Sequence, residues 1–222
     1  MKLDYKAVIF DFNGTLFFDN DKHIKAWGEI SKRLRGTELQ ETELLEHING
    51  VPNNKVIQYM LDGKATDEQM NQYSLLKEKI YRDFCKKDES TFHLVKGSSA
   101  YFDQLKKKNI PFTIASASIK PNIDFFVESF CLDDWIQPSD IVYDDGTYKN
   151  KIAMFKNAAD KLHTPIEDIL VIEDSISGIK NAAEAGCKNI VVVDSAKQFD
   201  IYKKLPYVKK VIHDFTELLE NN

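Results

Sequence analysis

From about residue 94 onward, short apolar runs alternate with amphipathic stretches, and a similar apolar run lies at 7–10. The later apolar runs, which predict strands, cover residues 112–116, 141–143, 169–174, 190–194 and 210–213. The stretches between them predict helices near 98–108, 121–131, 151–162 and 176–185. The segment Thr164-Pro165-Ile166-Glu167 has the capping residue, proline and glutamate that are typical of a helix start. This alternation predicts an α/β fold, with a Rossmann-like, doubly wound, mostly parallel sheet.

The stretch 16–93 has a different pattern. It has no clear strand, and its apolar residues recur at helical spacing, as at Leu44, Leu45 and Ile48. Thr66-Asp67-Glu68-Gln69 resembles a capping box at a helix start. A structureless loop of this length is improbable inside a compact domain. We therefore expect residues 16–93 to form an inserted helical cap domain, with 1–15 and 94–222 forming the catalytic core.

Composition and charge narrow the function classes. The chain has 222 residues, 43% hydrophobic and 29% charged, with a net charge of −5. Scattered basic residues argue against a nucleic-acid partner, and the absence of a long apolar run or signal-peptide pattern argues against a membrane protein. Three widely spaced cysteines are typical of reduced thiols in a cytoplasmic protein. No long apolar surface segment demands a partner, so we expect a monomer or a weak dimer.

Acidic residues end two of the predicted strands. Asp11 closes the run 7–10 and is followed at once by the turn residues Gly14-Thr15, and Glu173-Asp174 close the run 169–172. Open α/β sheets bind ligands at the carboxyl ends of their strands. Carboxylates are preferred ligands of Mg²⁺, and a carboxylate can also attack phosphorus and carry the phosphoryl group. The pattern predicts a magnesium site, built from Asp11, the carbonyl of Asn13 and the pair Glu173-Asp174, around the nucleophile Asp11.

Two further groups suit phosphoryl transfer. Ser116 ends the predicted strand 112–116, with Ser118 just beyond, and Lys149 precedes the predicted helix 151–162. A hydroxyl and an ammonium at these places can hold the phosphoryl oxygens, where charge must be stabilised. Each is unremarkable alone, but their order on successive strand ends indicates one site.

This order resembles the haloacid dehalogenase superfamily of phosphotransferases over nearly the whole chain. By that resemblance Asp11 is the nucleophile, Ser116 the hydroxyl of the second motif, and Lys149 the lysine of the third. Glu173 and Asp174 match the acidic pair of the fourth motif, which implies Mg²⁺ as cofactor, with Asp174 as a direct ligand and Glu173 beside it. The helical insertion resembles the small α-helical cap of that family.

Within the superfamily, the chain is most similar to β-phosphoglucomutase and its phosphatase relatives. His23-Ile24-Lys25-Ala26-Trp27 resembles the opening of that group's cap, and Ser116-Ala117-Ser118 matches its second motif. Lys77 falls where a lysine that partners the cap histidine is expected. The resemblance implies substrate-binding roles for Thr15, His23, Lys77, Ala117 and Ser118.

Three positions depart from the family pattern. Asn13 replaces the aspartate that normally acts as general acid and base, and an amide cannot hand a proton to a leaving alkoxide. Asn49 and Asn53 replace the lysine and arginine with which the mutase holds a second phosphate. The third motif reads Lys149-Asn150 where Lys-Pro is usual.

Three functions remain open on the sequence. The first is a Mg²⁺-dependent phosphatase for a small phosphorylated metabolite, favouring acyl or aryl phosphates, with water, His23 or Lys77 partly replacing the missing acid. The second is a phosphate-ligand binding or regulatory protein that has lost turnover. The third is a β-phosphoglucomutase-like isomerase, which is disfavoured because asparagines replace both cationic side chains that would hold a second phosphate.

Overall fold

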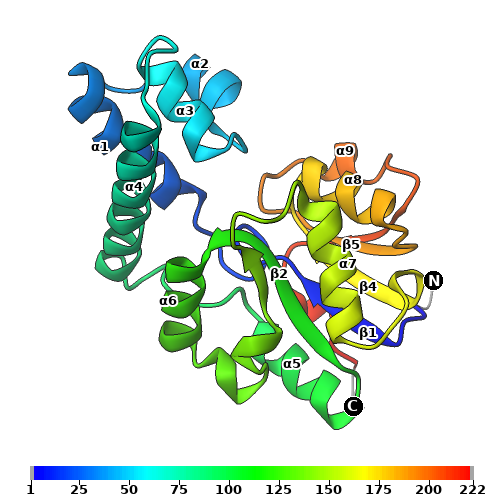
Figure 1. Ribbon diagram of the computed structural model, residues 1–222. Helices are drawn as coiled ribbons and strands as arrows, with labels where there is room; N and C mark the ends of the chain where they lie inside the picture. Colours follow the sequence, from blue (N-terminus) through cyan, green and yellow to red (C-terminus); the bar gives the residue numbers. More distant parts are fainter. Residues whose placement is uncertain (1–2, 221–222) are drawn as a thin grey trace. The chain divides into compact units, whose positions relative to one another are not determined.

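A computed structural model describes residues 3–220 as two compact units, one formed by 3–18 and 93–220 and the other by 19–92. The first unit contains one parallel sheet of six strands in the order β3-β2-β1-β4-β5-β6 (Figure 1). Its strands are β1 (Ala7–Phe10), β2 (Phe112–Ile119), β3 (Val142–Asp144), β4 (Ile169–Glu173), β5 (Asn189–Val193) and β6 (Val208–Ile212). The predicted doubly wound α/β sheet is therefore confirmed.

Five helices connect these strands: α5 (Ser98–Lys107), α6 (Lys120–Phe130), α7 (Lys151–Lys161), α8 (Ile176–Ala185) and α9 (Phe199–Tyr202). The β1 run Ala7–Phe10 is buried on both faces, as a central parallel strand requires. Ala7 and Ile9 pack in one cluster with α7 and α8 side chains. Phe10, which faces the opposite way, packs edge-on against Phe102 of α5, with ring centroids 5.1 Å apart. The central strand is thus fixed from both faces, and this packing also fixes the position of Asp11, which follows Phe10.

The chain changes direction across the sheet at β1. From β1 it builds outward through β2 and β3, and then returns to the other side of β1 to build β4, β5 and β6. In open α/β sheets, the crevice at such a switch point is where ligands bind. The carboxyl ends of β1, β2 and β4 meet there, so the topology brings together the three strand ends that the sequence singles out.

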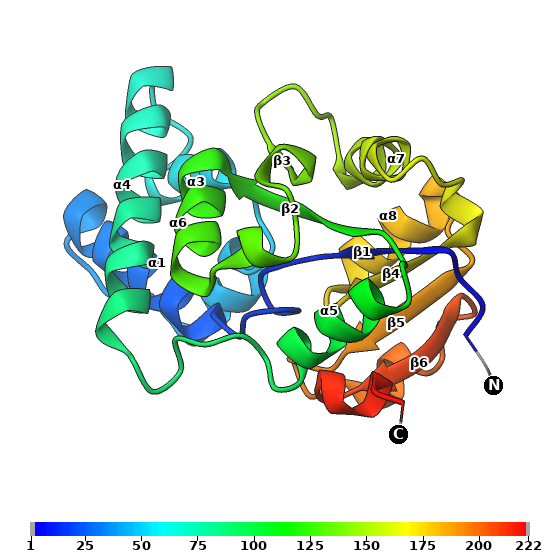
Figure 2. The same cartoon turned by 90° about the horizontal axis from the view of Figure 1, so that it is seen from below.

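The second unit is entirely helical over its described residues. It comprises α1 (Asn20–Arg35), α2 (Glu41–Glu43), a π-helical turn (Leu44–Ile48), α3 (Asn53–Met60) and α4 (Asp67–Lys87); α1, α3 and α4 are labelled in Figure 2. The capping box is present, since Thr66 Oγ1 accepts from Gln69 N–H at 3.2 Å and Gln69 Oε1 accepts from Thr66 N–H at 2.9 Å. Trp27, Ile30 and Ile57 contribute to its separate apolar core.

The first boundary of the helical unit lies three residues later than the sequence predicts, at 18/19 instead of 15/16. Leu16 and Phe17 belong to the sheet unit, because the Leu16 carbonyl accepts from Val95 N–H at 2.8 Å and the Phe17 ring packs against Phe130, with centroids 5.4 Å apart. The second boundary, at 92/93, differs from the prediction by one residue.

The predicted helix start at Thr164 is wrong. The segment forms only a 3-10 turn, Ile166–Asp168, and β4 begins at the next residue. Thr164 Oγ1 donates to the Leu162 carbonyl at 3.0 Å and so does not cap a following helix. Proline and glutamate fit the first turn of an α-helix and of a 3-10 helix alike, and β4, which follows at once, leaves no room for a second turn.

Candidate active site

Asp11 follows β1 directly and is 5% exposed. Its Oδ1 accepts from the Lys151 ammonium at 2.6 Å, and its Oδ2 accepts from Thr15 Oγ1 at 3.2 Å. Both oxygens are therefore oriented by donors before any ligand arrives. Thr15 is fully buried and its hydroxyl contacts the side chain of Asp11, while its role in substrate binding stays a prediction.

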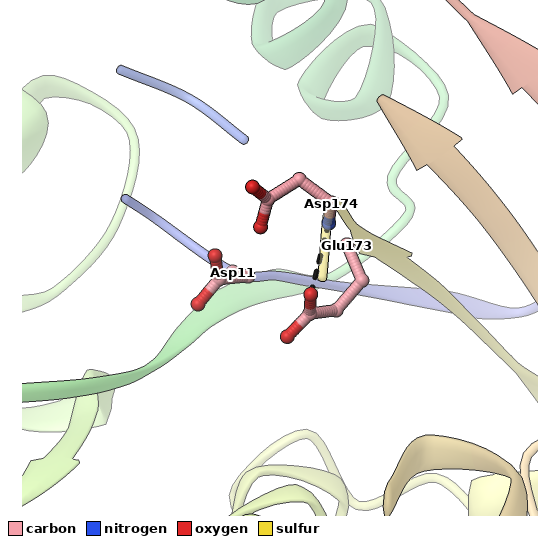
Figure 3. A group of neighbouring side chains, drawn as sticks. All are labelled: Asp11, Glu173 and Asp174. Carbon is pink, nitrogen blue, oxygen red and sulfur yellow. Dashed lines mark hydrogen bonds between the residues drawn. The ribbon is translucent and has the colours of Figure 1, made fainter. Parts of the chain in front are cut away.

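Glu173 and Asp174 close β4 beside Asp11, and the three carboxylates each place an oxygen within 4.8 Å of the others (Figure 3). Glu173 is fully buried, and its Oε1 contacts Lys151. Its Oε2 accepts from the backbone N–H groups of Asp174 and Ser175, both at 2.8 Å. Glu173 is fully buried and bound to Lys151 and to the backbone that leads into α8, so it serves to position these groups, and Asp11 and Asp174, which are not fully buried, remain as the carboxylates suited to a metal.

Two glycines make room for these carboxylates. A Cβ on Gly14, whose φ is +79°, would lie 2.1 Å from Asp174 Oδ2. A Cβ on Gly178, in the first turn of α8, would lie 1.8 Å from Glu173 Oε1. Both distances are far below van der Waals contact, so only glycine allows the acidic pair to lie where it does.

The Gly178→Ala variant should lose stability by about 1–3 kcal/mol, as overpacked interiors do. Alanine normally favours a helix over glycine by about 1 kcal/mol, so a loss would report the clash with Glu173. Gly28→Ala in α1 is the matched control, since nothing lies within 4 Å of a Cβ there, and it should be neutral or stabilising. Urea unfolding of both variants measures the difference, and equal effects of the two substitutions would contradict this account.

Burial and mutual repulsion shape the charges of the cluster. Burial, opposed by Lys151 and assisted by Glu173, raises the pKa of Asp11 to about 6. Burial and the nearby charges of Glu173 and Asp11 raise the pKa of Asp174 well above its usual range. Burial alone would lower the pKa of Lys151, but the two carboxylates that it contacts raise it. Three carboxylates face one ammonium, so the site favours a further positive charge beside Asp11 and Asp174.

A magnesium ion fits this donor set. Hard carboxylate oxygens from Asp11 and Asp174 lie close together, and the absence of a Cβ at Gly14 lets the Asp174 carboxylate lie against the turn that follows β1. These two side chains, with the backbone carbonyl of Asn13, are the residues that would hold the ion.

The end of β2 adds a polar cluster around Asn13. Asn13 Oδ1 accepts from Ser118 Oγ at 2.7 Å and, at a longer 3.4 Å, from Ser116 Oγ. Ser116 is 1% exposed, whereas Ala117 is exposed. The structure thus brings Asn13, Ser116 and Ser118 together, and β2 continues past the predicted end at Ser116 to Ile119.

Lys149 lies before α7, as the sequence predicts, but outside the carboxylate cluster. It is exposed in the loop before α7, and Lys151 makes the contacts to Asp11 and Glu173. Asn150 is the N-cap of α7, with its Oδ1 accepting from Ala153 N–H at 3.3 Å, so Lys151 is the first helical residue. The cap sets which lysine enters the site, and the third-motif spacing alone does not reveal it.

His23 and Lys77 lie in the helical unit and contact each other there. The Lys77 ammonium is 2.7 Å from His23 Nδ1 and 2.9 Å from Glu78 Oε1, and His23 Nε2 is 3.3 Å from Asp19 Oδ2. These contacts fit a neutral imidazole that accepts from Lys77 and donates to Asp19. Asn53 Nδ2 donates to Glu78 Oε1 at 2.8 Å, so this asparagine at the start of α3 is bound within the same network.

Comparison with known proteins points to one family. Residues 8–192 match the family model described as haloacid dehalogenase-like hydrolase. A hydrolase structure from Entamoeba histolytica, described as haloacid dehalogenase family IA, variant 3, is 36% identical, covers 96% of this chain and 95% of its own, and has a TM-score of 0.90. A comparison with curated proteins found no match.

More distant structures share the fold. CbbY from Rhodobacter sphaeroides, in complex with phosphate, is 18% identical with a TM-score of 0.78, and 96% of each chain is covered. A β-phosphoglucomutase from Clostridium difficile is 20% identical with a TM-score of 0.76, covering 97% of this chain and 93% of its own. No helix among residues 3–220 is both long and apolar enough to span a membrane.

Proposed function

Because this chain belongs to the haloacid dehalogenase-like hydrolase family, we propose that it is a Mg²⁺-dependent phosphatase acting on a small phosphorylated metabolite. The observation that carries the proposal is the Asp11 carboxylate, oriented at the switch point of the sheet by Lys151 and Thr15 and flanked by Asp174. This placement suits a nucleophile better than a structural ion pair, because it is built at the sheet edge where ligands bind.

The proposed reaction has two steps on Asp11. A carboxylate oxygen attacks phosphorus, the bond to the leaving oxygen breaks, and an aspartyl-phosphate forms. Water then attacks the same phosphorus, the bond to Asp11 breaks, and inorganic phosphate leaves while the water's proton passes to solvent. A bound Mg²⁺ would offset the repulsion between the anionic nucleophile and the anionic substrate.

The chain's other residues hold the phosphoryl group. The Lys151 ammonium and the Ser116 hydroxyl lie next to Asp11 and Asn13 respectively, where they can donate to phosphoryl oxygens as charge develops. Asn13 can donate a hydrogen bond to the leaving oxygen but has no acidic proton to transfer. Substrates whose leaving groups need little protonation, such as acyl and aryl phosphates, are therefore favoured.

Two other functions are weaker candidates. A ligand-binding protein without turnover is favoured only by the amide at position 13. A mutase would need to hold a second phosphate, but the loop positions at issue carry Asn49 and Asn53, and Asn53 is bound to Glu78. Conversion of glucose 1-phosphate to glucose 6-phosphate with added bisphosphate would favour the mutase.

The Asp11→Asn variant should lose phosphatase activity by at least about 10³-fold, because an amide of the same shape is not a nucleophile. The measurement is phosphate release from a panel of acyl, aryl and sugar phosphates with Mg²⁺. Chelation by EDTA should abolish the wild-type activity, and added Mg²⁺ should restore it. Unchanged metal-dependent hydrolysis by Asp11→Asn would reject Asp11 as nucleophile, and a panel without any turnover would favour the binding protein.

A further inference from the structure

We infer that Ser195, in the loop after β5, is a positioning residue that fixes the carboxylate of Asp174 for metal binding. The inference rests on the proposed magnesium site and adds a residue from a fourth strand end to it. Ser195 Oγ donates to Asp174 Oδ2 at 2.9 Å. Among the described residues it is the only hydrogen-bond donor to this carboxylate.

Ser195 completes the orientation of the three carboxylates, because the other two are held by partners of their own. Asp11 is held by Lys151 and Thr15, and Glu173 by Lys151 and two backbone N–H groups. The hydroxyl of Ser195 fixes the rotation of the Asp174 carboxylate and, by holding Oδ2, determines where Oδ1 lies. Carboxylate ligands that are oriented in this way bind their metal more tightly.

The loop that carries Ser195 is itself anchored. Asp194 is 8% exposed, and its Oδ1 accepts from Gln198 N–H at 2.6 Å. Its own N–H donates to the Ile212 carbonyl on β6 at 2.8 Å, and Ser195 N–H donates to the Val193 carbonyl at 2.9 Å. Since β5 pairs directly with β4, with Val192 opposite Glu173, the hydroxyl is delivered to Asp174 by rigid neighbouring strands.

The test is the affinity of substrate-free protein for Mg²⁺ alone, measured by isothermal titration calorimetry. Ser195→Ala should raise the Kd for Mg²⁺ by about 10- to 100-fold, the usual range for loss of a partner that orients a ligand. Ser195→Thr keeps the hydroxyl and should restore most of the affinity. Gln198→Ala, in the same loop, retains the backbone contact to Asp194 and should bind Mg²⁺ like the wild type.

The outcomes separate this inference from the proposed function. Wild-type binding with an unchanged Kd in Ser195→Ala overturns the positioning role and leaves the magnesium site intact. An absence of Mg²⁺ binding by the wild type overturns both. A melting temperature of metal-free Ser195→Ala close to that of the wild type shows that the effect is on the metal and not on the fold. If the alanine variant does not fold, Ser195→Cys, of similar size but a weak donor, is expected to weaken Mg²⁺ binding likewise.

Discussion

Replacing Asn13 by aspartate is expected to raise kcat for phosphate esters of alcohols by about 10²–10⁴-fold, the usual contribution of a general acid. An alkoxide is a poor leaving group unless it receives a proton as the bond to phosphorus breaks. The amide of Asn13 cannot supply that proton, whereas a carboxylic acid at the same place can. Acyl and aryl phosphates, whose leaving groups need little protonation, should gain far less.

The geometry around position 13 supports a direct exchange of amide for acid. Asn13 Oδ1 already accepts from Ser118 Oγ and, more weakly, from Ser116 Oγ. Aspartate has the same shape and can accept from the same hydroxyls. The nearby negative charge of Asp11 would also favour the protonated form of a new carboxyl group, which is the form that donates.

The measurement is kcat for a series of phosphates with leaving groups of increasing pKa, comparing wild type with Asn13→Asp. The dependence of rate on leaving-group pKa should be steep in the wild type and shallow in the variant. The double variant Asp11→Asn with Asn13→Asp is the control and should be inactive. Peptide mapping confirms that Asn13, which precedes glycine, has not deamidated in the wild-type protein.

A wild-type enzyme that already hydrolyses alkyl phosphates as fast as Asn13→Asp would contradict this expectation. It would mean that another group supplies the proton, with water, His23 and Lys77 as the candidates. Turnover that appears only in Asn13→Asp would instead identify the natural chain as a binding protein on a catalytic scaffold.

The sequence predicts the fold and the acidic centre because both follow from short apolar runs, each of which fits only one kind of structure. A fully apolar run such as Ala7–Phe10 fits a buried parallel strand, and residues that end parallel strands meet at one edge whatever the loops do. Asp11, Glu173 and Asp174 are therefore predicted together, and the structure places them together.

Contacts that depend on exact loop and helix geometry are not visible in the pattern. The Thr15 hydroxyl contacts Asp11 because the chain turns tightly after Phe12, whose carbonyl accepts from Leu16 N–H at 2.8 Å. Ser195 contacts Asp174 from the loop after β5, which carries no motif. Gly178 lies within the predicted helix 176–185, but its close approach to Glu173 depends on the three-dimensional arrangement.

The assignment of the phosphoryl-binding lysine differs most clearly between sequence and structure: the sequence predicts Lys149, and the structure places Lys151 against the carboxylates. Lys151→Met should lower kcat by about 10²–10³-fold, the usual effect of removing one donor from a site of developing charge. It should also lower the free energy of unfolding by about 3–5 kcal/mol, because Asp11 and Glu173 would be left without their buried partner. Lys151 is 13% exposed in its side chain and contacts both carboxylates.

Lys149→Met is the matched control, since the same substitution is made two residues away on an exposed side chain. It should change the free energy of unfolding by less than about 0.5 kcal/mol, as is usual at the surface, and leave kcat unaltered. Lys151→Arg, which keeps the charge with a different shape, should recover stability more than activity. Urea unfolding and phosphate release, measured on all three variants, decide the assignment. A large loss of activity in Lys149→Met, together with a normal Lys151→Met, would return the phosphoryl-binding role to Lys149.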